Sequence, residues 1–93
     1  MDQVTDERLE RYFAVTKQAL GIAQKAPRND EQAVAIILDM AQRYVSDAEH
    51  FAKNNDKVLA FAALNYAHGW LDCGARLELF VVDDDQLFTV DVD

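Results

Sequence analysis

The sequence predicts an all-α protein, a three-helix up-and-down (antiparallel) bundle with a short extended C-terminal tail. Three stretches repeat apolar residues at the three- and four-residue steps that are typical of amphipathic helices. Only three glycines and one proline interrupt the 93 residues, and 51% of the residues are hydrophobic, as in an ordered globular domain. A chain of this length can build one core but not two, so residues 1–93 are expected to form a single domain.

The first helix is predicted over residues 5–26. Thr5 can cap its first turn, and Asp6 and Glu7 suit the positive end of the helix dipole. Pro27 is expected to stop the helix, because proline cannot continue it. The apolar stripe of this helix comprises Leu9, Tyr12, Phe13, Thr16, Ala19, Leu20, Ala23 and Ala26.

A second helix is predicted over residues 30–53. Asn29 followed by Gln32 resembles a capping box at its start. Its apolar stripe comprises Val34, Ile37, Leu38, Ala41, Tyr44, Val45, Ala48, Phe51 and Ala52. Two acid–base pairs at i, i+4 spacing, each expected to contribute ~0.2 to 0.5 kcal/mol, follow its polar face: Asp39–Arg43 and Glu49–Lys53.

A third helix is predicted over residues 56–80, after a polar break at Asn54 and Asn55. Asp56 can cap it, and the short connection forces it to pack antiparallel to the second helix. The acidic residues 83–85 are expected to end the helical stretch. We expect nearly every side of this helix to be buried, because apolar residues cover most of its circumference: Val58, Phe61, Ala62, Leu64, Tyr66, Ala67, Trp70, Leu71 and Leu77.

The tail, residues 83–93, is predicted to be extended, because Phe88, Val90 and Val92 alternate with polar residues. The sequence contains no other strand that could form a sheet with it. Two arrangements stay open. The tail can lie across the bundle and shield apolar surface, which we favour, or it can pair with a second chain.

The charge and cysteine content exclude several classes of partner. Seventeen acidic residues against nine basic ones give a formal net charge of -8, which repels phosphate backbones and anionic lipid headgroups. We therefore expect no nucleic acid and no membrane as partners, and no apolar run reaches the ~20 residues that cross a bilayer. Cys73 is the single cysteine, which suits a reducing, cytoplasmic location. The excess of aspartate over lysine also suits a salt-adapted host.

Four polar residues lie on one face of the third helix: Asn65, His68, Asp72 and Arg76. One hypothesis is a polar site in which Asp72 orients His68 as a general base and Arg76 binds an anion. Such a site would belong to a small hydrolase or a ligand-binding protein. We favour the alternative, in which the face is a solvent-exposed strip joined by an Asp72–Arg76 pair.

No metal or cofactor site is predicted. The two histidines, His50 and His68, lie on opposite sides of the turn near Asn54, and their heights along the bundle differ by ~13 Å, which one metal ion cannot bridge. The paired Glu-x-x-His motifs of di-iron bundles are absent from the sequence. Cys73 is expected to be a small core residue, since no histidine lies near it at helical spacing.

The third helix also has features of an interaction surface. Tyr66, Trp70 and Phe80 would form an aromatic cluster. Such a cluster is usually part of the core, but with Phe88 of the tail it can anchor a partner if the bundle leaves these side chains exposed. A line of small residues would let another helix approach closely, either within the chain or from a partner: Ala60, Ala63, Ala67 and Gly74.

The segment Ala60-Phe-Ala-Ala-Leu-Asn-Tyr-Ala-His-Gly-Trp-Leu-Asp-Cys-Gly-Ala-Arg-Leu77 resembles the signature region of an archaeal family known as domain of unknown function 357. The resemblance implies a three-helix up-and-down bundle and an archaeal, cytoplasmic origin, and it implies no catalytic residue. Two residues depart from the family pattern. Cys73 stands where alanine is expected, and Glu78 stands where a glycine would favour the end of the helix, whereas glutamate allows another turn.

We predict a non-enzymatic helical module that binds a protein partner or a second copy of itself through the third helix or the tail. The rival hypothesis is the hydrolase or ligand-binding protein that uses the four polar residues of the third helix.

Overall fold

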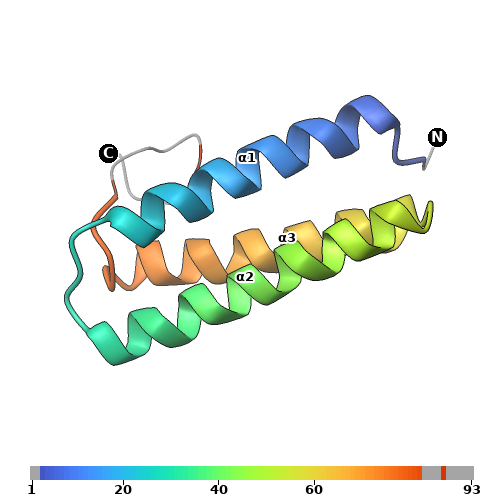
Figure 1. Ribbon diagram of the computed structural model, residues 1–93. Coiled ribbons are helices and arrows are strands. Elements are labelled where there is room, and N and C mark those ends of the chain that lie inside the picture. The colour runs from blue at the N-terminus through green and yellow to red at the C-terminus, as the bar shows by residue number, and fades with distance from the viewer. Residues whose placement is uncertain (1–2, 83–86, 88–93) are drawn as a thin grey trace.

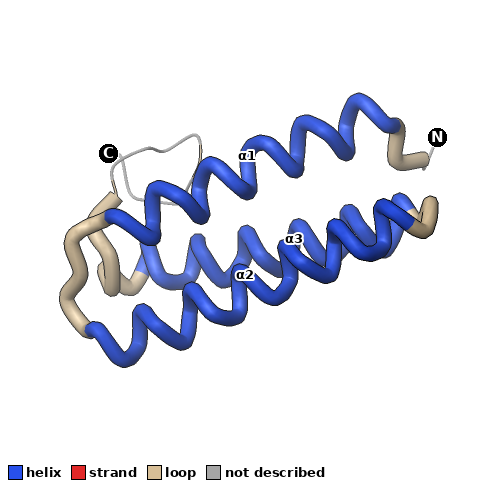
Figure 2. Tube along the Cα trace, in the orientation of Figure 1, coloured by secondary structure: helices blue, strands red, loops and turns tan. Residues whose placement is uncertain are grey.

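The computed structural model describes residues 3–82 and residue 87, and it contains three helices: α1 (Asp6–Lys25), α2 (Glu31–Lys53) and α3 (Lys57–Arg76). The helices run up, down and up, with α2 and α3 side by side below α1 (Figure 1). Short loops join them, and the described part of the chain has no strand (Figure 2). The prediction of an all-α three-helix bundle is therefore confirmed.

Side-chain caps fix where the helices begin. The hydroxyl oxygen of Thr5 accepts a hydrogen bond from the Arg8 backbone N–H (3.1 Å), and Asp56 caps α3 through the Leu59 N–H (3.1 Å). The prediction that Asn29 caps α2 is wrong, because Asp30 accepts the bond from the Ala33 N–H (3.0 Å).

The polar faces carry ion pairs that bridge helices as well as pairs within them. The predicted Asp39–Arg43 pair is present at 2.8 Å. Glu49, which was expected to pair with Lys53, instead contacts Lys17 of α1 at 2.8 Å. At the other end of α1, Lys57 pairs with Asp6 at 2.7 Å. Both of these bridges hold α1 against its neighbours, although exposed pairs of this kind stabilise by only about 0.2 to 1 kcal/mol.

The end of α3 differs from the predicted end at residue 80. The helix stops at Arg76, and the chain reverses through a Schellman motif. In this motif the Glu78 N–H donates to Ala75 O (3.0 Å), and the Leu79 N–H donates to Gly74 O (2.9 Å). Glu78 has φ = 57°, the left-handed conformation that usually requires glycine. The helix thus ends as if residue 78 were the glycine of the family pattern, and residues 83–85, expected to mark its end, lie well beyond it.

Replacing Glu78 with glycine is expected to raise the free energy of unfolding by about 0.5 to 1 kcal/mol, because glycine adopts this conformation without the clash of a Cβ atom. Glu78→Ala is the matched control: it also removes the carboxylate from the negative end of α3 but keeps the Cβ atom. Urea denaturation measures both variants. Equal stabilisation by the two would show that the charge, not the backbone, is responsible.

The segment after α3 is tied to the loop between α1 and α2. The Val81 N–H donates to Pro27 O (2.8 Å), the Asn29 N–H donates to Leu79 O (2.9 Å), and the Asn29 side chain donates to Glu78 O. Arg28 and Phe80 form an isolated antiparallel bridge. These bonds fold the chain back against the bundle and direct Phe80 inward.

The core has two parts, one at each end of the bundle, and both contain several alanines. The end near the α1–α2 loop buries Ala19, Leu20, Ala23, Val34, Ile37, Ala41, Val45, Ala67, Leu71, Ala75, Phe80 and Leu87. The other end buries Leu9, Ala48, Ala60, Ala63 and Leu64. Ala60, Ala63 and Ala67 are at most 5% exposed, so the line of small residues on α3 faces the chain's own helices.

Within the tail, Leu87 is described and belongs to the core, with an exposed fraction of 7%. Its side chain therefore packs against the bundle of its own chain. Residues 83–86 and 88–93, and with them the predicted extended conformation and Phe88, lie outside the described residues.

Candidate functional site

The surface of α3 that points away from the bundle, which we call the outer face, carries large apolar side chains. Val58 is 63% exposed, Tyr66 63% and Leu77 64%, and Leu59 is exposed as well. Between these residues the outer face carries small ones, namely Ala62, Gly69 and Cys73. The expectation that α3 is buried on nearly every side is therefore wrong. Most of its alanines face the core, and its larger apolar side chains at Val58, Leu59 and Tyr66 stay at the surface.

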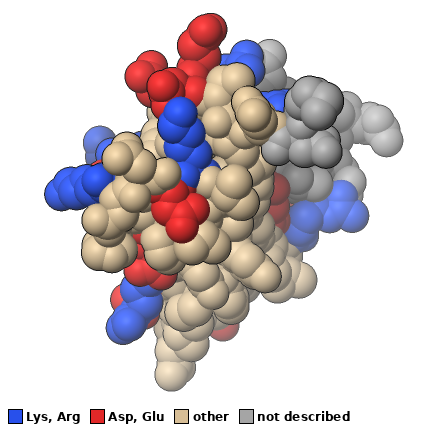
Figure 3. Space-filling view, turned by 90° about the vertical axis from the view of Figure 1, so that its right-hand side faces the viewer, with Lys and Arg blue, Asp and Glu red and all other residues tan. Residues whose placement is uncertain are grey.

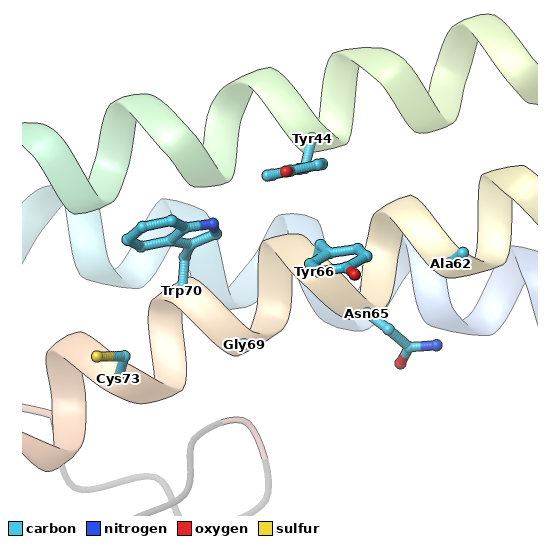
Figure 4. Close-up of a pocket in the computed structure, with 7 residues that line it drawn as sticks. All are labelled: Tyr44, Ala62, Asn65, Tyr66, Gly69, Trp70 and Cys73. Atoms are coloured by element: carbon cyan, nitrogen blue, oxygen red, sulfur yellow. The ribbon is translucent and has the colours of Figure 1, made fainter.

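A groove runs along the outer face between α3 and α2. It has a volume of about 610 Å³, within the range of ligand and peptide grooves. Tyr44 of α2 and Tyr66 stack over it, with ring centroids 5.2 Å apart and planes 18° from parallel. Figure 4 shows Trp70 directed toward α2 beside Tyr44. Gly69 and Cys73 also line the groove, and their small side chains leave space next to these rings. Aromatic walls beside small residues give the groove a shape that a helix side chain can enter.

The outer face is poor in acidic residues. Between Asp56 and Glu78 the sequence has one acidic residue, Asp72, although the whole chain has seventeen. In the end view of Figure 3 the lower centre of the surface is mostly uncharged, and most charged side chains lie around this area. Another molecule can therefore approach this side without facing a row of carboxylates.

The structure divides the four predicted polar residues between two places. Asn65, His68 and Asp72 border a pocket of about 480 Å³ between α1 and α3, together with Arg8 and Arg11. Arg76 borders a separate hollow beside Asn29 and Glu78. Both Asp72 and Arg76 have interactions within the protein. Arg76 therefore does not join the other three in one site.

His68 is held by the tail. Its Nε2 lies within hydrogen-bonding distance of the carbonyl oxygen of Leu87, and 3.8 Å from Oδ1 of Asp72. A carbonyl oxygen only accepts, so Nε2 carries the hydrogen of this bond and is not available as a general base. The contact positions the ring and connects α3 to Leu87. Among the described residues, no three or more His, Cys, Asp or Glu side chains converge as a metal site would require.

The predicted interaction residues are only partly at the surface. Tyr66 is exposed and Trp70 is half-buried at the edge of the groove. Phe80 was a candidate anchor only if the bundle left it exposed, and it is 1% exposed and one of the largest buried side chains, so it belongs to the core. The prediction that Cys73 is a core residue is wrong, since its thiol is exposed at the groove. Tyr44, Arg8 and Arg11 were missed because sequence periodicity does not show which helices meet around a pocket.

Comparison with family models gives one match: residues 11–80 match the model described as "Protein of unknown function (DUF357)". Comparison with curated proteins and with solved structures gives no match. Among the described residues, no helix is long and apolar enough to span a membrane.

Proposed function

We propose that this chain, which belongs to the DUF357 family of proteins of unknown function, is a non-enzymatic helical protein-interaction module whose outer face on α3 binds a second copy of the chain. The observation that supports this most is the exposure of Val58 and Tyr66 on α3 and of Leu77 at its C-cap, each more than 60% exposed. Large apolar side chains grouped on a monomer surface are typical of interaction sites.

The spacing of the outer face suits a helix pair. Leu59, Ala62, Tyr66, Gly69, Cys73 and Arg76 follow at alternating three- and four-residue steps, the repeat with which two helices pack along a seam. If a two-fold axis passes between Tyr66 and Gly69, two α3 helices pack antiparallel with large residues facing small ones. The opposed pairs are Tyr66 with Gly69, Ala62 with Cys73, and Leu59 with the aliphatic stem of Arg76.

The distribution of charge also favours this antiparallel pairing of two copies. A chain with a net charge of -8 repels its own copies most where acidic residues are dense, and the outer face is where they are sparse. In the antiparallel pair, Arg76 of each copy also comes near Asp56 at the start of the other α3, so opposite charges meet at both ends. The dipoles of the two helices are also opposed.

The polar side of α3 supports a non-enzymatic role. Nε2 of His68 is engaged with Leu87, and Arg76 lies outside the pocket that holds His68 and Asp72. The hydrolase hypothesis assigns the base to His68 and anion binding to Arg76, and these two side chains border different pockets, so the binding hypothesis accounts better for this geometry.

The test is the mass in solution. We expect wild-type protein to scatter light as a dimer and Gly69→Arg to scatter as a monomer, because an arginine at this position would occupy the place of the second copy's Tyr66. Gly21→Arg is the matched control: a Cβ atom at either glycine meets nothing within 4 Å, and Gly21 lies in α1. Circular dichroism checks that both variants fold. A monomeric wild type, or equal loss of dimer in both variants, would overturn the proposal.

Cross-linking tests the register. In the proposed pair, the two Cys73 residues are separated by about 16 Å along the helix axis, too far for a disulfide. Ala62→Cys places a thiol opposite Cys73 of the second copy, and we expect a disulfide-linked dimer under mild oxidation. Wild type is the control and should stay unlinked. Rapid linking of wild type, with none in the variant, would exclude this register.

We also propose a cytoplasmic role in a salt-adapted archaeal host. The lone thiol of Cys73 is exposed, which suits a reducing compartment, and the acidic composition keeps a protein hydrated in concentrated salt. High salt would weaken the repulsion between two acidic copies and favour the dimer. Light scattering at low and high salt therefore measures the oligomeric state and also tests the proposed adaptation to salt.

A further inference from the structure

The pocket between α1 and α3 adjoins the groove on the outer face, and Asn65 and Gly69 line both. Arg8, Arg11 and Tyr12 of α1 line one side, and Asn65, His68 and Asp72 of α3 line the other. Its volume of about 480 Å³ is that of a site for a small molecule. We propose that this pocket binds a small organic oxyanion, a phosphate or carboxylate attached to an apolar group.

The proposal rests on Arg8 and Arg11, the two arginines that line the pocket. Four other basic residues form ion pairs: Lys17, Arg28, Arg43 and Lys57. Arg8 and Arg11 form none with any described residue, although the chain is strongly acidic. They are three residues apart in α1, so their side chains project from the same face one turn apart and repel each other. An oxyanion between them removes this repulsion and accepts from both planar guanidinium groups.

The other side of the pocket is polar, and its one carboxylate, Asp72, interacts with other groups of the protein. Asp72 is engaged with His68 at 3.8 Å and has further interactions within the protein. The side-chain amide of Asn65 can donate to an anion, and this side chain forms no hydrogen bond with the described residues. The ring of His68 is held by Leu87, which keeps this wall of the pocket fixed.

The floor of the pocket is apolar, which is why we propose an organic anion. Tyr12 packs edge-on against Phe61, with ring centroids 4.7 Å apart, so its ring is held in place. Val15 lies beside it and is half-buried. An inorganic ion would contact the arginines alone, whereas a ligand with a ring or short hydrocarbon chain would also cover these two side chains.

The experiment is a titration of the full-length protein followed by amide chemical shifts, with phenyl phosphate, benzoate and inorganic phosphate as probes. We expect one of the two aromatic probes to bind more tightly than inorganic phosphate and to shift resonances around Arg11 and Asn65. The better of phenyl phosphate and benzoate identifies phosphate or carboxylate as the preferred group. Stronger binding by inorganic phosphate than by either aromatic probe would overturn the organic part of the proposal.

Charge variants separate a built site from general attraction to a basic side chain. Arg8→Gln/Arg11→Gln is expected to weaken binding at least about tenfold, because both guanidinium contacts are lost. Lys25→Gln/Lys53→Gln removes the same charge at two exposed residues outside the pocket and should leave affinity unchanged. Equal losses in the two double variants, or no shifts with any probe, would exclude the site. Light scattering on the same samples measures the dimer separately, because Gly69 lines both this pocket and the proposed dimer interface.

Discussion

Replacing Phe80 with alanine is expected to lower the free energy of unfolding by about 3 to 5 kcal/mol, the usual cost of emptying the site of a buried phenylalanine. Phe80 is 1% exposed and lies in the larger part of the core with residues from all three helices. Its backbone is bridged to Arg28, so the surrounding loop has little freedom to collapse into the space left behind. Urea denaturation at one protein concentration, followed by circular dichroism, measures the loss.

Val81→Ala is the matched control for this measurement. Val81 is the next residue along the chain but is 56% exposed, so its truncation should change the free energy of unfolding by less than about 0.5 kcal/mol. The comparison separates burial of the ring from general disturbance of the segment after α3. Similar losses in the two variants would mean that Phe80 does not fill the core as described.

The bounds of α1, the end of α2 and the start of α3 could be predicted because local chemistry determines them. Thr5 and Asp56 cap helices through bonds to residues three positions ahead, and Pro27 follows the end of α1. These signals need no knowledge of the rest of the fold. The polar turn at Asn54 and Asn55 ends α2 in the same way, with Asn55 in the left-handed conformation that asparagine tolerates.

The end of α3 could not be predicted because a distant contact determines it. Glutamate is a good helix former and disfavours φ = 57°, so the local preference at Glu78 is to continue the helix. Burial of Phe80 against Ile37 and Gly74, together with the bonds to the loop at Pro27 and Asn29, favours the reversal. The apolar surface that Phe80 buries outweighs the backbone strain at one residue.

The sequence also could not predict which side of α3 faces the core. The helix carries apolar residues on most of its sides, so their periodicity does not show which side is buried. The structure turns the alanines inward, because they let α3 approach α2 and α1 closely, and leaves Val58, Leu59 and Tyr66 outside. This choice explains why the prediction that Cys73 is a core residue was wrong. It also produces the outer face on which the proposed function depends.

Replacing Gly74 with alanine is expected to destabilise the protein by about 2 kcal/mol. A Cβ atom at this position would lie 2.4 Å from Cε1 and 2.7 Å from Cζ of the Phe80 ring, and 3.3 Å from Ile37. The ring is fully buried and cannot move aside without disturbing its neighbours, so overpacking costs up to about 3 kcal/mol. The better helix propensity of alanine offsets about 1 kcal/mol of that cost.

Gly69→Ala, measured at a protein concentration too low for the proposed dimer, gives the same gain in helix propensity without the clash, because a Cβ atom there meets nothing of its own chain within 4 Å. This variant should therefore be more stable than wild type by about 1 kcal/mol, so the same substitution five residues apart is expected to act with opposite signs. Combining Gly74→Ala with Phe80→Leu should cost less than the sum of the two single changes, since the smaller side chain makes room for the methyl group. If Gly74→Ala stabilises the protein as Gly69→Ala does, Phe80 does not pack against Gly74, and the described end of α3 is wrong.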